Sequence, residues 1–273
     1  MAVRSAPHQR AGEAAAVSHA ALRVEFQNQS GQVLSGRLEQ PEGRPVAWAV
    51  FAHCFTGTKN LRAISRIVEP LVARGVAVLR FDFTGLGSSE GEFADTTFSH
   101  NVADLVAAAS HLEGSHGVPS LLIGHSLGGT AALHAAALLP AVSAVATIGA
   151  PAHAAHVARL LRSSVPQIEA TGEAKVNLGG RTFTIRREFL LDLERHATLD
   201  VVRELRGALL VMHSPVDSTV DVENASEIFR AAWHPKSFVS LDRADHLLSS
   251  EQDAAYAGSV LAAWAQKYVV VAT

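Results

Sequence analysis

The chain has 273 residues, of which 48% are hydrophobic and 18% are charged, so it can bury a substantial core and form one large α/β domain. Its formal net charge of −3 argues against nucleic acid or an anionic membrane as a partner, because neither would meet a basic surface. The single cysteine, Cys54, cannot form an internal disulfide. This is typical of a reducing compartment and predicts a cytoplasmic location.

Residues 1–20 are rich in alanine, serine and histidine and lack an apolar block of the length found in signal peptides. We therefore expect a disordered tail, followed by one domain over residues 21–273. Arg4 and Arg10 leave an organelle-targeting segment open, although Glu13 and the lack of an amphipathic face count against it. Because no run approaches about 18 apolar residues, we expect no membrane-spanning helix.

The first half of the domain alternates strands with helices. Alternating apolar and polar residues predict a β-hairpin over 22–28 and 33–40. Apolar runs predict strands over 46–52, 76–81, 121–123 and 142–148. Helices are predicted over 61–74, from a cap at Asp95 or Thr96 to about residue 112, and from the turn after residue 123 to residue 139. Such repeats imply a mostly parallel sheet with helices on both faces.

The rhythm changes over residues 151–200, which contain many charges and a predicted hairpin over 176–185 that turns at Gly179-Gly180. An insertion at this place predicts a small lid over one edge of the sheet. The core resumes with a strand over 208–212, a helix over 222–232, a strand over 237–241 and a helix over 254–268. The apolar run at residues 268–272 is compatible with a homodimer edge or with a frayed end.

The sequence Gly-His-Ser-Leu-Gly-Gly at residues 124–129 joins a predicted strand to a predicted helix. A G-x-S-x-G pattern at such a junction predicts a strained serine whose hydroxyl lies above the sheet edge, at the positive end of the helix. A side chain at Gly124 or Gly128 would crowd the neighbouring strand or helix. Ser126 is therefore a candidate nucleophile, and the alternative is an ordinary glycine-rich turn.

A serine nucleophile needs a base to take its proton and a carboxylate to orient that base. Asp217 and His246 each follow a late strand, so both are expected at the same sheet edge as Ser126. Asp221 is the second candidate acid, but its place near a helix start favours capping. His213 is the rival base, and we expect it to form a local hydrogen bond instead.

Other histidines are less suited to this chemistry, although the chain contains 14 of them. We expect His53 to shape the loop after the strand over 46–52, and the side chain of His125 to point away from Ser126. His153 and His156 lack a nearby carboxylate or cysteine cluster and form only a weak metal pattern.

The pair Gly85-x-Gly87 lacks the third glycine and the Lys-Ser/Thr of a phosphate-binding loop. With neither a strong metal pattern nor a nucleotide pattern, we expect no metal and no organic cofactor.

The negative oxygen of a tetrahedral intermediate needs preorganised donors. The amide of Leu127 is one candidate, and the second should come from the loop after the strand over 46–52, where we choose Phe55. Candidate walls of an apolar acyl pocket, besides Leu127 and the Phe55 ring, are Phe83, Phe183, Phe189 and Leu190. Lid residues that only packed on the core would show the same pattern.

Several segments together resemble the α/β-hydrolase superfamily, in its small-lid esterase and serine-aminopeptidase-like branch. They are His53-x-Phe55-Thr56-Gly57, Arg80-Phe81-Asp82-Phe83-Thr84-Gly85-x-Gly87-x-Ser89, the serine motif at 124–129, Asp217 and Asp245-His246. The likeness covers about residues 22–268 and is greatest to a hydrolase domain that precedes an OsmC-type domain in some bacterial proteins. It implies an α/β-hydrolase fold, a triad of Ser126, Asp217 and His246, and oxyanion donors at Phe55 and Leu127.

The sequence departs from the family pattern in two ways. Cys54 stands where many relatives have glycine, which is expected to tighten the oxyanion loop. No OsmC-type domain follows the hydrolase region, so we expect no thiol peroxidase activity.

These features predict a serine hydrolase, and specifically a carboxylesterase whose partner is a small or medium acyl ester. Cleavage of amides or peptides stays open, because acidic lid residues could recognise a substrate amino group: Glu169, Glu173, Glu188, Asp192 and Glu194. These residues could equally form a solvated face. The third alternative is a non-catalytic ligand-binding protein on the same scaffold, since fold alone does not confer activity.

Overall fold

A computed structural model describes residues 20–269. The predicted tail, apart from residue 20, and the apolar C-terminal run from residue 270 lie outside the described residues. Within residues 20–269, eight strands form one sheet in the order β1-β2-β4-β3-β5-β6-β9-β10. Their bounds are β1 Ala20–Gln27, β2 Val33–Gln40, β3 Ala47–Ala52, β4 Val76–Phe81, β5 Pro119–His125, β6 Ala144–Ile148, β9 Ala208–His213 and β10 Lys236–Ser240.

The strands from β4 to β10 in this order run parallel, whereas β1 and β2 form an antiparallel hairpin that joins β4 through β2. Strands β4 and β6 are buried at every position, as expected for parallel strands covered on both faces. The register aligns His125 with Ile148, Ile148 with Met212, and His213 with Ser240. The predicted mostly parallel sheet is confirmed, and the strands that precede Ser126, Asp217 and His246 end along one edge.

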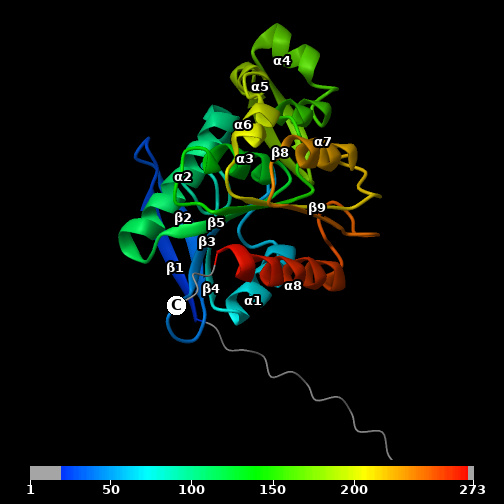
Figure 1. Ribbon diagram of the computed structural model, residues 1–273. Coiled ribbons are helices and arrows are strands. Elements are labelled where there is room, and N and C mark those ends of the chain that lie inside the picture. The colour runs from blue at the N-terminus through cyan, green and yellow to red at the C-terminus, as the bar shows by residue number, and fades with distance from the viewer. Residues whose placement is uncertain (1–19, 270–273) are drawn as a thin grey trace, which may run out of the picture.

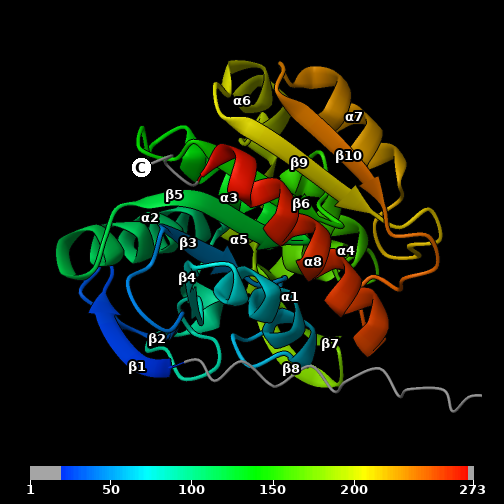
Figure 2. The ribbon, with the colours of Figure 1, turned by 60° about the horizontal axis from the view of Figure 1, so that its bottom comes forward.

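Helices cover both faces of the sheet (Figure 1). One face holds α1 Arg62–Ala73 and α8 Glu251–Tyr268, which lie side by side across the strands (Figure 2). The other holds α2 Phe98–Ser115, α3 Leu127–Ala136, α6 Thr198–Glu204 and α7 Glu223–Ala231. Alternate residues of β3 enter the two cores, Val50 on the α2 and α3 side and Phe51 on the α1 and α8 side. Within the described residues, no helix has the length and apolar character needed to cross a membrane.

The segment at residues 151–200, called the insertion below, leaves the sheet after β6. It contains η2 Ala154–Arg159, α4 Val165–Thr171, β7 Glu173–Leu178, β8 Arg181–Arg186 and α5 Arg187–Glu194. Strands β7 and β8 pair antiparallel and turn at Gly179 and Gly180, whose φ angles of 59° and 80° suit a two-residue hairpin turn. The predicted hairpin is thus confirmed. Apolar residues of the insertion, such as Ile168, Ile185 and Phe189, join the core on the α2 and α3 side.

The predicted cap of α2 at Asp95 or Thr96 is wrong. The N-cap is Thr97, whose amide donates to His100 Nδ1 (3.1 Å). Asp95 instead ends the short helix η1 Phe93–Asp95, and the hydroxyl of Thr96 donates to the carbonyl of Phe93 (2.8 Å). Asp95 also pairs with Arg186. Both side chains therefore have other partners, and neither caps α2.

Three other helix ends differ from the prediction. Helix α2 ends at Ser115 rather than at about residue 112. Helix α3 ends at Ala136 rather than at residue 139, and α8 begins at Glu251 rather than at residue 254. The earlier start of α8 follows from Ser250, whose hydroxyl accepts a hydrogen bond from the Asp253 amide (3.3 Å).

A largely buried histidine makes the stability of the native state depend on pH. His134 of α3 packs against the rings of Phe98 (centroid distance 5.3 Å) and His196 (5.1 Å). Burial, and to a lesser degree the charge of His196, lowers the pKa of His134 from 6.5 to about 4. Between these values the unfolded chain takes up a proton that the native state does not, so the native state loses stability as pH falls.

We expect His134→Leu to weaken this pH dependence. Between pH 7 and pH 5 the wild-type free energy of unfolding should fall by about 1–2 kcal/mol more than that of the variant, since each unit of pKa difference corresponds to about 1.4 kcal/mol. Urea denaturation of both proteins at the two pH values measures this difference. Equal losses would contradict the account of His134 as a buried neutral side chain.

Candidate active site

Ser126 occupies a strained turn between β5 and α3. Its backbone angles are φ 54° and ψ −128°, a region that non-glycine residues seldom adopt. Three hydrogen bonds hold the turn: the Ser126 amide donates to the carbonyl of Ile148 (2.8 Å), and the amides of Gly129 and Thr130 donate to the Ser126 carbonyl (2.8 and 3.3 Å). The predicted strain is therefore present at this serine and supported by its surroundings.

The glycines on either side of Ser126 lie where no side chain fits. A Cβ at Gly124 would lie 2.2 Å from the carbonyl oxygen of Gly128, and one at Gly128 would lie 2.3 Å from that of His53. The predicted crowding is confirmed. The second contact also places the start of α3 against the end of β3, where the loop that carries Phe55 begins.

The structure brings Ser126, His246 and Asp217 into one chain of hydrogen bonds. Ser126 Oγ donates to His246 Nε2 (2.9 Å), and His246 Nδ1 donates to Asp217 Oδ2 (2.7 Å). The side chains of His246 and Asp217 are 10% and 2% exposed. Such a chain can move a proton from the hydroxyl to the imidazole and stabilise the charge that forms there.

Asp217 is held as a carboxylate. Its Oδ1 accepts hydrogen bonds from the amides of Thr219 (2.8 Å) and Val220 (2.9 Å), while Oδ2 faces His246. Burial opposes the charge, but the hydrogen bonds from His246, Val220 and Thr219 outweigh it and keep the pKa of Asp217 below its ordinary value. Asp217 is thus ionised at neutral pH.

The two rival residues form local hydrogen bonds, although the N-cap of α7 is Val222 and not Asp221. Asp221 Oδ1 accepts from the amide of Glu223 (2.9 Å) at the start of α7. His213 Nε2 donates to the carbonyl of Val220 (2.8 Å) and lies 3.7 Å from Asp217 Oδ2. Both residues therefore shape the loop around Asp217.

Two supports of His246 were not predicted. His125 Nε2 donates to the backbone carbonyl of His246 (2.7 Å). Burial, and to a lesser degree the charge of His246, lowers the pKa of His125 to about 4. His125 is therefore a neutral donor at neutral pH. A Cβ at Gly149, where φ is 57°, would lie 3.4 Å from both Asp217 Oδ2 and His246 Nδ1. The only sequence signals were the place of His125 beside Ser126 and a glycine directly after a strand.

The candidate oxyanion donors lie on either side of the contact between β3 and α3. Leu127 is the first residue of α3, so its amide has no acceptor within the helix. Phe55 lies in the loop at residues 53–60, called the oxyanion loop below. His53 shapes this loop, as predicted: its Nδ1 donates to the Cys54 carbonyl (2.8 Å), and its Nε2 accepts from the Phe83 amide (3.4 Å).

Burial keeps both titratable side chains at the start of this loop uncharged. It lowers the pKa of His53 to about 4 and raises the pKa of the Cys54 thiol to about 11. A thiol that stays protonated at neutral pH is a poor nucleophile, so Cys54 acts as a buried filler.

Aromatic side chains link the oxyanion loop to the insertion. The ring of Phe55 stacks on Phe189 (centroid distance 5.3 Å) and lies 5.6 Å from Phe93, which lies 4.9 Å from Phe183. The structure thus brings Phe183 and Phe189 together with Phe55, and half-buried Leu190 packs on the same core. Phe93 was missed, and its signal was a large aromatic residue within a polar, glycine-rich loop.

Phe83 lies apart from these rings. It is 2% exposed and packs in the core between His53 (4.8 Å) and Phe81 (4.9 Å). Phe83 contacts the oxyanion loop through the ring of His53.

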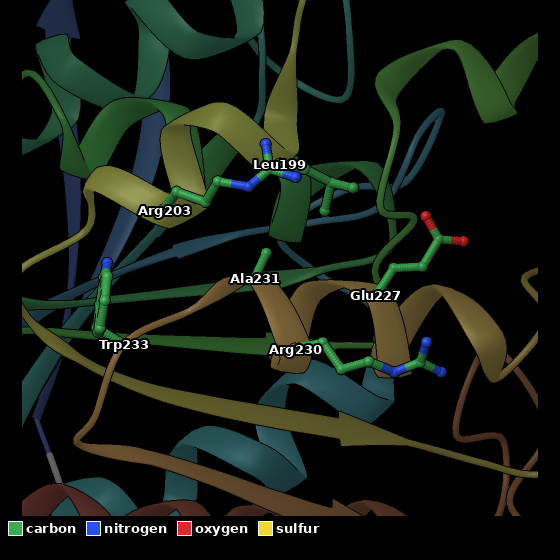
Figure 3. A pocket seen from close by; sticks show the side chains of 6 residues that line it. All are labelled: Leu199, Arg203, Glu227, Arg230, Ala231 and Trp233. Carbon is green, nitrogen blue, oxygen red and sulfur yellow. The ribbon is translucent and has the colours of Figure 1, made fainter.

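One surface hollow lies away from Ser126 and its partners. This hollow has a volume of about 500 Å³ and lies between α6 and α7. Figure 3 shows its lining residues, which include neither Ser126 nor its partners: Leu199, Arg203, Glu227, Arg230, Ala231 and Trp233. His153 pairs with Glu227 (3.1 Å), and His156 donates to the carbonyl of Thr219 (3.3 Å). Over residues 20–269, no group of three or more histidine, cysteine or acidic side chains could hold a metal ion.

Comparison with known proteins gives relatives at three levels of similarity. The esterase domain of a Rhodothermus marinus protein is 50% identical, with a TM-score of 0.76, over 91% of this chain and 99% of that domain. The human mitochondrial palmitoyl-protein thioesterase ABHD10 is 27% identical over 208 residues, which are 72% of this chain. The chain spans 59% of that relative's length. Mouse alpha/beta hydrolase domain-containing protein 10 shares the fold at 22% identity, with a TM-score of 0.74 over 90% of this chain and 99% of that one.

A family model also matches the chain, over residues 44–189, and its description is serine aminopeptidase, S33. This range includes the oxyanion loop, the serine turn and most of the insertion. The match agrees with the eight-stranded sheet and with the resemblance that the sequence motifs indicated. The chain belongs to the serine aminopeptidase S33 family of the α/β-hydrolase superfamily.

Proposed function

We propose that this protein is a carboxylesterase that cleaves small to medium acyl esters through an acyl-enzyme on Ser126. The observation that carries the proposal is the hydrogen-bond chain from Ser126 Oγ through His246 to Asp217. The 50% identity to an esterase domain supports the choice of an ester as substrate.

In the proposed first step, Ser126 Oγ attacks the ester carbonyl carbon while its proton passes to His246 Nε2. The tetrahedral intermediate collapses when His246 returns this proton to the leaving alkoxide, which departs as an alcohol. His246 then takes a proton from water as the water oxygen attacks the acyl-enzyme carbonyl carbon. The second tetrahedral intermediate releases the acid when His246 gives this proton to Ser126 Oγ, which restores the free serine and the neutral imidazole. Asp217 keeps the imidazole in one tautomer and stabilises its positive charge.

The amides of Leu127 and Phe55 are the proposed donors to the oxygen that becomes negative in this intermediate. Preorganised donors of this kind contribute about 10²–10³ in rate each. The start of α3 adds the positive end of its helix dipole. These groups need no cofactor, so the proposal includes none.

Aromatic and aliphatic side chains of the insertion are the proposed walls of the acyl pocket. Phe183, Phe189 and Leu190 come from this segment, and the Phe55 ring meets them from the oxyanion loop. An apolar wall favours an acyl group over a charged one. A cytoplasmic location and a homodimer remain predictions from the sequence.

Acyl thioesters are a second candidate substrate class. The similarity to palmitoyl-protein thioesterases named ABHD10 favours this class, and the proposed mechanism differs only in the leaving group, a thiol instead of an alcohol.

Amide or peptide cleavage is less favoured, because part of the acidic surface of the insertion already has partners. Glu173 pairs with Arg186 (3.3 Å), and Asp192 accepts hydrogen bonds from Ser99 (2.7 Å). A non-catalytic ligand-binding role is also less favoured, since a binding protein has no chemical need for an aligned serine, histidine and carboxylate.

The first prediction for catalytic activity concerns the proposed nucleophile, Ser126. We expect wild-type protein to hydrolyse p-nitrophenyl esters of short and medium acyl chains, and Ser126→Ala to lower kcat by at least about 10³-fold. An amino-acid p-nitroanilide measured in parallel should turn over far more slowly than the esters. Ester turnover that survives Ser126→Ala would contradict the proposal, and preference for the anilide would move it to amides.

The second prediction separates the two candidate acids. Asp217→Asn should lower kcat by about 10³–10⁴-fold, because an amide does not hold the imidazole in the required tautomer. Asp221→Asn is the matched control and should retain kcat within a few fold, since the asparagine carbonyl can still accept the hydrogen bond from the Glu223 amide. Ester hydrolysis by both purified variants measures this, and equal losses would remove Asp217 from its proposed role.

A further inference from the structure

The crown of the oxyanion loop, residues 55–57, contains a strained residue. Thr56 has a φ of 60°, which is an outlier for a β-branched side chain. Strain of this kind costs about 1–3 kcal/mol and persists only where the surroundings hold it. One hydrogen bond, from the Gly57 amide to the Cys54 carbonyl (2.9 Å), closes the turn.

The core holds the two ends of the oxyanion loop. At its start, His53 donates to the Cys54 carbonyl. At its end, the Lys59 amide donates to Asp82 Oδ1 (2.7 Å), the Lys59 ammonium pairs with the same carboxylate, and Arg80 donates to the Lys59 carbonyl. These contacts act on either side of the crown.

The insertion meets the crown itself. A guanidinium nitrogen of Arg181, the first residue of β8, donates to the carbonyl of Thr56. The Arg181 guanidinium also lies over the ring of Phe183, 5.1 Å from its centroid. Beside this contact, the ring of Phe55 stacks on Phe189 of α5 with an interplanar angle of 21°.

Contacts outside β8 also hold the hairpin that carries Arg181. At the other end of β8, Arg186 pairs with Asp95 of η1 and with Glu173 of β7. Asp192 of α5 accepts hydrogen bonds from the amide and the hydroxyl of Ser99 (both 2.7 Å), at the start of α2. The insertion is therefore fixed on both sides of the strand and helix that contact the crown.

We propose that Arg181 is a positioning residue for the oxyanion hole: it holds the strained Thr56 peptide, and through it the Phe55 amide, in the geometry that accepts the negative oxygen. The inference rests on the proposed function. In this account the insertion covers the site and also supports the oxyanion loop through the hydrogen bond from Arg181 to Thr56. A partly misplaced donor should cost less than a lost one, so a loss of about 10- to 100-fold in kcat is expected when Arg181 is removed.

The test compares Arg181→Ala, Arg181→Lys and Arg187→Ala with wild type and Ser126→Ala on one p-nitrophenyl ester. Arg187 is the matched control, because its guanidinium donates to the carbonyl of Glu169 within the insertion and not to the oxyanion loop. We expect Arg181→Ala to lower kcat about 10- to 100-fold with KM changed by less than about 3-fold. Lysine should restore most of the loss, since it also donates to a carbonyl, and Arg187→Ala should stay within about 2-fold of wild type.

A second readout uses a stable analogue of the tetrahedral intermediate. An alkylboronic acid forms a tetrahedral adduct with a serine nucleophile, and its inhibition constant should rise in Arg181→Ala in parallel with the fall in kcat. Thermal denaturation of each variant controls for folding. An unchanged kcat in folded Arg181→Ala, or an equal loss in Arg187→Ala, would overturn the positioning role alone. Turnover that survives Ser126→Ala would overturn the proposed function itself.

Discussion

The fold depends on one close approach between backbones, where β5 turns into α3 beside the end of β3. A Cβ at Gly124 or Gly128 would lie 2.2 or 2.3 Å from a backbone carbonyl oxygen, so only glycine lets the start of α3 pack this closely against β5 and β3. Ser126 lies in the tight turn between β5 and α3, where its φ is 54°. The close approach also brings the oxyanion loop beside the first turn of α3, so the candidate nucleophile and the candidate oxyanion donors share one constraint.

The parallel sheet determines which other residues can reach this turn. Strands β5, β9 and β10 run in the same direction and end in register, so the loops that carry Asp217 and His246 open onto the same edge as Ser126. Around them, amides of Thr219 and Val220 hold the carboxylate, and neutral His125 holds the backbone of His246. Each proposed catalytic group is therefore oriented by a neighbour that has itself been fixed by the fold.

The sequence predicted the strands of the main sheet, the longer helices, the hairpin of the insertion and the three residues of the hydrogen-bond chain, because apolar periodicity, glycine spacing and the order of loops are local properties. The short helices α4, α5 and α6 were not predicted. The sequence did not show which distant side chains would contact one another in the fold. Asp95 was expected to cap α2, yet it pairs with Arg186 from an insertion far along the chain. Phe83 was expected on a pocket wall, whereas it packs beneath His53. The link from Arg181 to Thr56 joins residues 125 positions apart, and no local pattern marks such a contact.

The central claim is that Ser126 is a nucleophile activated by its neighbours, and covalent labelling tests it most directly. Folded protein would be treated with a fluorophosphonate at neutral pH, beside Ser126→Ala, and the adduct located by mass spectrometry of peptides. The account predicts one adduct per chain, on Ser126, and none on the variant. An adduct on another residue, or no reaction in wild-type protein, would contradict it.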